Sequence, residues 1–315
     1  GDDTFEEEDI DLSEVDDDSG QNILSLPGTY RFGIIDSDAN AVGGADDPAQ
    51  TIDISDFNSA ISDSISIRVV DTTLDGNFTT YNGQISTDDS IIDFQGNAIG
   101  QDTVVIAFVD SRGNVNTDTV TVDSDDQFDR DDFSLGGLAE GTVSGHIISQ
   151  GRDGTFGANT NGIDDEDDLT DQIENNFSAS SASGEQVRQQ IIANTVDDTA
   201  SDDQIITETF RLTDGLTSID SATSPVESNG TITVEGQTNR RPDDNTITAE
   251  LLTEDDESVV IGTTDQWGLD GNYDIEIELA DVEPANYTLE VDDGSNTDRV
   301  PVQVVEQVQE TPEPT

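Results

Sequence analysis

Hydrophobic and polar residues alternate one by one in many short stretches of this chain. In residues 273–280, YDIEIELA, the apolar positions are Tyr273, Ile275, Ile277 and Leu279, and acidic residues fill most of the positions between them. A period of two places all apolar side chains on one face of an extended strand. The pattern therefore predicts half-buried β-strands with one face in water.

Other segments show the same period, among them 64–71 (SISIRVVD) and 286–291 (NYTLEV). Residues 102–123 read as two such runs joined by a turn near 111–114, which predicts a hairpin. Pro301 interrupts the run RVPVQVV. Because proline has no amide hydrogen for a ladder, we expect this last strand to lie at a sheet edge.

One order of segments occurs three times: an aspartate beside an aromatic residue, an acidic stretch, an apolar strand and a closing strand. The aromatic residues that mark the copies are Phe5 in DDTF, Phe128 in DDQF and Trp267 in TDQW. We expect all three to occupy the same place in a core. Many short strands with turns between them predict an all-β chain of β-sandwiches in tandem.

The three copies predict how the chain divides into domains. We expect a truncated sandwich at 1–70, two complete sandwiches at 71–214 and 215–307, and the start of a polar stalk at 308–315. The first copy lacks its initial strands, so we expect the sequence to be part of a longer chain.

The second copy contains an insertion near 164–196 whose apolar residues are spaced as in a helix. Leu169, Ile173 and Phe177 follow at intervals of four, and Val187 and Ile191 mark another face. This spacing predicts a small pair of helices inside an otherwise all-β chain.

Composition adds that the protein is adapted to molar salt. Aspartate and glutamate number 72, the ten basic residues are all arginine, and the formal net charge is -62. Such a charge opposes compaction in dilute buffer, but the Debye length falls to about 3 Å at 1 M salt. High charge with low hydrophobicity is also typical of disorder; the regular alternation of apolar residues argues against that alternative.

The same composition excludes several classes of protein. Nucleic acid would be repelled, and no apolar run reaches the roughly 20 residues of a membrane helix. The absence of lysine excludes a Walker loop, and no GxSxG occurs. The one histidine, His146, lies in a predicted strand. We expect a structural histidine and a protein that is not an enzyme.

Two acidic segments are candidate calcium or magnesium sites, since these ions take oxygen ligands. The first, DSDDQFDRDDF at 123–133, supplies Asp123, Asp125, Asp126, Asp129, Asp131 and Asp132. The second, at 159–169, supplies Asn159, Asn161 and Asp164. Neither fits an EF-hand loop: the first lacks its glycine and glutamate, and Gly157 stands where the second needs an acid. A solvated acidic surface is the alternative for both.

Four Asn-x-Ser/Thr sequons are candidate N-glycosylation sites, at Asn77, Asn176, Asn229 and Asn286. A chain this rich in asparagine, serine and threonine gives about as many by chance, so an extracellular location would be needed to make them meaningful.

Several longer stretches resemble the C-terminal portion of the S-layer glycoproteins of halophilic archaea. They occur in the same order along nearly the whole chain: DDTFEEEDIDL, LPGTYRFGIID, SRGNVNTDTVTVDSDD, HIISQGRDGTFG, NTVDDTASDDQIITETFRL, RRPDDNTITAELL and VEPANYTLEVDDGSNTDR. The resemblance implies tandem immunoglobulin-like domains and a structural role at the extracellular cell surface. It also implies N-linked glycans, self-assembly of copies into a hexagonal lattice and a need for divalent cations.

The same resemblance favours Asn286, within VEPANYT, as the glycosylated asparagine. The family's N-terminal domains, threonine-rich stalk and C-terminal membrane-anchoring segment have no counterpart here, so contact with a membrane would be made only through that segment. Two other hypotheses remain open: an adhesin or binding module with the same fold, and a secreted hydrolase. Arg240 and Arg241 are the one adjacent basic pair that could mark a ligand patch.

Overall fold

The computed structural model describes most of the chain from residue 27 to residue 307. The described residues are 27–35, 55, 58, 62–69, 71–152, 154–157, 162–178, 182–198, 201–242 and 244–307. The chain divides into two compact units, Gly1–Thr72 and Thr73–Thr315.

The described part of the first unit contains an antiparallel pair of strands, β1 (Gly28–Ile35) and β2 (Ser62–Val69). The strand predicted in SISIRVVD is thus confirmed. In the register of this pair Tyr30 lies opposite Ile67 and Phe32 opposite Ile65, so one face is apolar as the alternation predicts.

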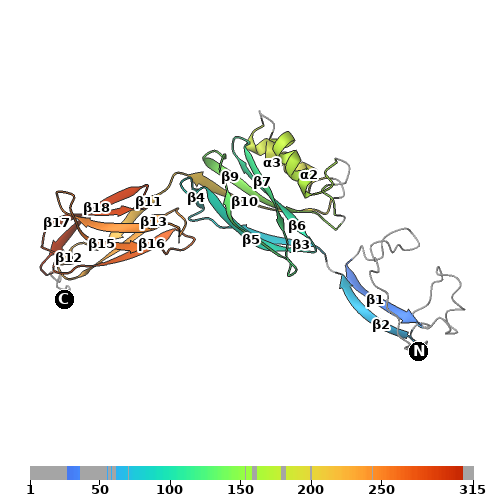
Figure 1. Ribbon diagram of the computed structural model, residues 1–315, viewed down its shortest axis with the longest axis horizontal. Helices are drawn as coiled ribbons and strands as arrows, with labels where there is room; N and C mark the ends of the chain where they lie inside the picture. Colours follow the sequence, from blue (N-terminus) through green and yellow to red (C-terminus); the bar gives the residue numbers. More distant parts are fainter. Residues whose placement is uncertain are drawn as a thin grey trace, which may run out of the picture. The chain divides into compact units, whose positions relative to one another are not determined.

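The second unit begins with a two-sheet structure that we call the middle sandwich (Figure 1). One sheet has the order β3-β5-β8 and the other β4-β10-β9-β6-β7. Its strands are β3 (Thr73–Phe78), β4 (Gln84–Ser86), β5 (Ile91–Ile99), β6 (Thr103–Asp110), β7 (Val115–Thr121), β8 (Gln127–Ser134), β9 (Gly141–Ser149) and β10 (Gln204–Thr213). The predicted hairpin is β6–β7.

The remaining strands repeat this topology in a second two-sheet structure, the last sandwich. Its sheets have the orders β11-β13-β16 and β12-β18-β17-β14-β15, which match those of the middle sandwich strand for strand. The strands are β11 (Thr217–Ala222), β12 (Val226–Glu227), β13 (Thr231–Thr238), β14 (Ile247–Leu252), β15 (Ser258–Thr264), β16 (Asn272–Glu278), β17 (Asn286–Asp292) and β18 (Thr297–Val305). The all-β tandem fold is therefore confirmed; the domain boundaries stay a prediction.

Pro301 on β18 has one ladder partner among the described strands, Thr288 of β17. On the side of β18 that faces away from β17, the short strand β12 pairs only with Val304 and Val305 and does not reach Pro301. The proline therefore lies where β18 has an open edge, as its missing amide hydrogen requires.

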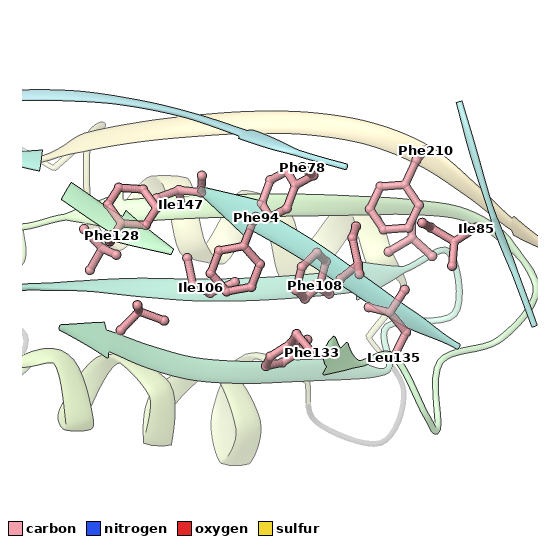
Figure 2. Packing of buried hydrophobic residues seen from close by; sticks show 14 of the residues in the cluster. Phe78, Ile85, Phe94, Ile106, Phe108, Phe128, Phe133, Leu135, Ile147 and Phe210 are labelled. Atoms are coloured by element: carbon pink, nitrogen blue, oxygen red, sulfur yellow. The ribbon is translucent and has the colours of Figure 1, made fainter. Parts of the chain in front are cut away.

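The core of the middle sandwich is built from phenylalanine rings contributed by both sheets (Figure 2). Phe108 of β6 lies 5.2 Å from Phe78 of β3 and 5.2 Å from Phe133 of β8, and 6.1 Å from Phe210 of β10, measured between ring centroids. Tilted and edge-to-face pairs at these distances add to the burial of apolar surface. Phe108 thus joins the two sheets.

The predicted helical insertion is confirmed and covers the outer face of the larger sheet of the middle sandwich. It comprises α2 (Glu166–Gln172), a single π-helical turn η2 (Ile173–Phe177) and α3 (Gly184–Asn194). Leu169, Ile173, Phe177, Val187 and Ile191 pack there against outward residues of β6 and β9, so β6 is buried on both faces. No described helix is long and apolar enough to cross a membrane.

In the three-stranded sheet of each sandwich, a glycine lies directly opposite an aromatic residue on the neighbouring strand and leaves room for its ring. Phe128 lies opposite Gly96, and Tyr273 lies opposite Gly236. Tyr273, not Trp267, is therefore the counterpart of Phe128, so the predicted alignment of Trp267 with Phe128 is wrong. Trp267 lies in the loop before β16 and is half-buried against the core of the last sandwich.

Replacing Gly96 by alanine is expected to destabilise the middle sandwich by about 1–3 kcal/mol, as overpacking does. A Cβ there would lie 2.1 Å from the Asp75 carbonyl oxygen and 2.4 Å from Cζ of Phe128. The free energy of unfolding in molar salt measures the effect. Gln95→Ala, one position away on the exposed face, is the control and should stay within about 0.5 kcal/mol of the native chain. Equal stability of both variants would contradict the packing argument.

Candidate functional site

The aspartate-rich segment 123–133 forms a turn followed by strand β8. Asp123 Oδ1 accepts hydrogen bonds from the amides of Asp125, at 2.8 Å, and Gln127, at 2.9 Å. Asp126 has a φ of 61°, which aspartate tolerates in such turns. Phe128 then points into the core with 2% of its surface exposed. The segment is thus a corner of the sandwich with its aromatic residue inside.

Beyond the turn, the strand alternation directs Asp129 and Asp131 to the outer face of sheet β3-β5-β8. They line a hollow of about 580 Å³. The central strand β5 places amides between the carboxylates: Gln95 lies opposite Asp129, and Asn97 lies opposite Asp75. Like charges directly opposite each other destabilise a sheet, so the amide-bearing strand separates them.

Asp132, the last of the six, is held by Arg241, and its amide donates to Asp93 Oδ1 at 2.8 Å. The six aspartates are therefore divided among a turn, an open face and an ion pair. Among the residues that the structure describes, no three histidine, aspartate or glutamate side chains gather in a way that could hold a metal ion. A calcium or magnesium site in this segment stays a prediction.

In the second acidic segment, Asp164 precedes helix α2. Its amide donates to Asp168 Oδ2 at 3.2 Å, and its carbonyl accepts from Gln150 Nε2 at 3.3 Å. Asn159 and Asn161 lie outside the described residues. A cation site in this segment is likewise a prediction.

The four sequons differ in how available their side-chain nitrogens are. Asn77, Asn229 and Asn286 are exposed, and their Nδ2 atoms make no hydrogen bond to any described residue. Asn176 lies in η2, and its Nδ2 donates to Gln172 Oε1 at 2.8 Å. Glycosylation at all four stays a prediction, and the geometry disfavours Asn176.

His146 is a buried structural residue on β9. Nδ1 lies 2.8 Å from Thr207 Oγ1 and Nε2 lies 3.1 Å from Ser144 Oγ. Although this is a serine–histidine pair, neither side chain has any exposed surface, so no substrate can reach it. Burial, helped by the positive charge of Arg188, lowers the pKa of His146 to about 4.

The neutral His146 makes stability depend on pH. Its pKa is lower in the folded chain than the ordinary 6.5, so the unfolded chain binds the extra proton. Stability should be fully present above pH 6.5 and should fall by about 3 kcal/mol as the pH drops to 4. The test compares unfolding of the native chain and His146→Gln between pH 7 and 4, since the acidic residues titrate in both. Parallel pH profiles would contradict a buried neutral histidine.

A cluster of arginines and aspartates lies at the joint between the middle and last sandwiches. Arg240, in the loop after β13, has a side chain only 8% exposed. Its Nη1 lies 2.8 Å from Asp88 and its Nη2 lies 3.0 Å from Asp89, both in the turn between β4 and β5. Trp267 Nε1 donates to the Arg240 carbonyl at 2.8 Å. Trp267 therefore supports the loop that carries the arginine.

Arg241 extends the joint to the small sheet of the middle sandwich. Its guanidinium pairs with Asp93 at 3.0 Å, with Asp132, and with Asp244 of its own loop at 3.3 Å. Burial tends to lower the pKa of Arg241, but Asp132, Asp93 and Asp244 outweigh it, so the pKa is raised. The residue stays charged at any ordinary pH.

Uncharged contacts complete the joint. Asn239 is almost fully buried; its Oδ1 accepts the amide of Leu216 at 2.7 Å and its Nδ2 donates to the carbonyl of Asp214 at 3.0 Å. The amide of Asn82 donates to the carbonyl of Leu269 at 2.8 Å. Sequence reasoning missed this joint. The signal for it was the adjacent arginine pair in a chain without lysine.

Replacing Arg240 by alanine should weaken the joint by about 3 kcal/mol, chiefly because Asp89, only 11% exposed, would lose its counter-charge. Calorimetry in molar salt should then resolve separate transitions for the two sandwiches. Arg299→Ala is the control: its side chain is 52% exposed beside Glu290, and loss of such a pair costs about 0–1 kcal/mol. A native-like transition in Arg240→Ala would show that the joint does not depend on this residue.

Comparison with solved structures gives only distant matches. A tetra-tandem repeat from the extending region of a large adhesion protein matches 91% of this chain and 59% of its own, with 16% identity and a TM-score of 0.29. Domains 4 and 5 of the S-layer protein SbsC match 33% of this chain and 63% of their own, with 14% identity and a TM-score of 0.22. With similarity this low, the sheet topology itself establishes the fold.

No family model matches the chain, but curated relatives do. A cell surface glycoprotein of Halobacterium salinarum is 52% identical over 312 residues, and one of Haloarcula japonica is 53% identical over 312 residues. These alignments cover 98% and 97% of this chain. The chain spans 35% of the length of each relative. With this identity along nearly all of its length, the chain is homologous to the cell surface glycoproteins of halophilic archaea, which are structural S-layer proteins of the cell surface.

Proposed function

We propose that these sandwiches form a stiff spacer and contact segment in a surface-layer subunit that assembles with copies of itself. The joint at Arg240 and Arg241 carries the proposal. Two sandwiches that each have their own core are joined there by buried charges, in one compact unit. A spacer that holds its length between neighbours needs such a joint, whereas a flexible linker between the sandwiches would leave their orientation free.

The medium in which the spacer works is molar salt. Exposed ion pairs such as that of Arg299 contribute little in water and less when salt screens them. The pair of Arg240 with Asp89 is largely buried on both sides, with side chains 8% and 11% exposed, so salt screens it much less. The joint therefore keeps its strength in the salt that the net charge requires.

Divalent cations assist the assembly in this proposal. Outer faces that carry Asp75, Asp129 and Asp131 repel the similar faces of other copies, and an ion between two copies relieves the repulsion. Because calcium takes six to eight oxygen ligands, a bridging ion would draw carboxylates from both surfaces. N-linked glycans on exposed sequons such as Asn286 would extend from the faces that stay in water.

An adhesin of the same fold is the alternative function. Its ligand patch was expected at Arg240 and Arg241, the one adjacent basic pair. Their guanidinium groups are occupied by Asp88, Asp89 and Asp93 within the joint. A ligand would have to displace these carboxylates, so the arrangement favours a structural role.

Chelation tests the cation-assisted assembly. Light scattering of the chain in about 3 M sodium chloride with calcium should show large assemblies, and excess EDTA should disperse them. Circular dichroism should retain the strand signal, since the cores need no metal. Adding calcium back is the control for reversibility. Assemblies that keep their size after chelation would contradict the role of the divalent ion.

A further inference from the structure

Arg112 is an exposed cation without a side-chain partner among the described residues. Arg130 and Arg299 are exposed but paired, with Asp118 at 3.5 Å and with Glu290. Arg68 and Arg211 are exposed and share with Arg112 the lack of a side-chain partner among the described residues. The guanidinium of Arg112 makes no hydrogen bond or ion pair to any described residue; only its backbone amide is bonded. In a chain with 72 acidic and ten basic residues, an exposed guanidinium without an internal partner is available to a carboxylate of another molecule. What distinguishes Arg112 from Arg68 and Arg211 is the turn that carries it.

The turn that carries Arg112 is held rigidly by Asp110, which has no exposed surface. Asp110 Oδ1 accepts the amides of Arg112, at 2.7 Å, and Asn114, at 3.0 Å. Its Oδ2 accepts Asn114 Nδ2 at 2.6 Å and the Ala139 amide at 2.7 Å. Burial raises the pKa of Asp110, but these hydrogen bonds outweigh it and lower the pKa. One buried charge thus ties the turn to the loop before β9.

Helix α3 supports the other side of the same turn. The amide of Gly184 donates to the Ser111 carbonyl at 3.2 Å. Gly113 has a φ of 90°, and a Cβ there would lie 2.3 Å from the Ala182 carbonyl oxygen. The backbone that presents Arg112 is therefore fixed on two sides, so its guanidinium projects from a rigid base.

Arg112 lines a hollow of about 420 Å³ at this end of the middle sandwich. Leu135 and Leu212 border the hollow from the core and are almost fully buried, so the partly exposed leucine there is Leu138. Thr87 adds a hydroxyl group, and the exposed Glu140 adds one carboxylate to the lining. The hollow thus offers the Arg112 guanidinium to an incoming carboxylate beside a single acidic residue of its own.

We infer that this hollow receives an acidic side chain from a second copy of the chain. The inference rests on the self-assembly proposed above and names one of its contacts. Charge complementarity identifies the partner, because the surface of any neighbouring copy is rich in carboxylates. Guanidinium and carboxylate groups form two parallel hydrogen bonds, and a pair partly enclosed by the hollow is screened less by salt than an open one.

Zero-length crosslinking tests the contact, because the chain contains no lysine. Arg112→Lys introduces one side-chain amine, which a carbodiimide joins to any carboxylate that it touches. Glu140→Gln in the same variant removes the carboxylate of the same copy that lines the hollow. Assemblies of this variant in about 3 M sodium chloride, a salt level at which distant charges are screened, should give a crosslinked dimer. Mass spectrometry of the dimer should identify the acidic partner. Arg130→Lys is the control, since its neighbour Asp118 lies in the same copy and should give only an intrachain link.

Association itself gives the second readout. Arg112→Ala should weaken self-association by about ten- to hundredfold in sedimentation at graded concentrations, whereas Arg130→Ala should not. Thermal unfolding checks that both variants fold. Native-like association of Arg112→Ala, or an amine that couples only within its own copy, would overturn this contact and leave the proposed assembly standing. A native chain that stays monomeric with calcium would overturn both.

Discussion

Seventy-two carboxylates repel one another in a chain with only ten arginines, and the fold reduces this repulsion at two places in the middle sandwich. On the outer face of β3-β5-β8 the amides of Gln95 and Asn97 lie between acidic rows. At the joint, two adjacent arginines meet four aspartates of the middle sandwich. Many other carboxylates face solvent, where molar salt would screen them almost to contact distance.

Buried polar groups have a different task, which is to hold loops in place. Asp110 fixes a turn and a loop with four hydrogen bonds, and His146 stays neutral between two hydroxyl groups. Because an unpaired buried charge is costly, each of these groups is fully bonded or uncharged. Arg112 contrasts with them: it is exposed on a rigid turn, and its guanidinium has no partner among the described residues of its own copy.

The joint and the hollow at Arg112 suggest how one sandwich chain could serve as part of an assembly. Pairs buried inside the chain, such as Arg240 with Asp89, set the relation of two sandwiches to each other. An exposed cation without an internal partner can instead attract a carboxylate from the acidic surface of another copy. The few arginines are thus divided between contacts within one copy and a contact that we infer between copies.

The sequence by itself determined the strands and the helical insertion, since these follow from local periodicity; adaptation to molar salt stays a prediction from composition. In β16 the alternation from Tyr273 to Leu279 predicted the buried face correctly. Homology to the archaeal surface proteins could also be recognised from residue order. Only the tertiary structure decided that Tyr273, not Trp267, is the counterpart of Phe128. It also decided that Arg240 and Arg241 reach aspartates of the middle sandwich, and that Arg112 has no side-chain partner among the described residues. Register and long-range pairing depend on how distant strands pack, and no local pattern encodes that.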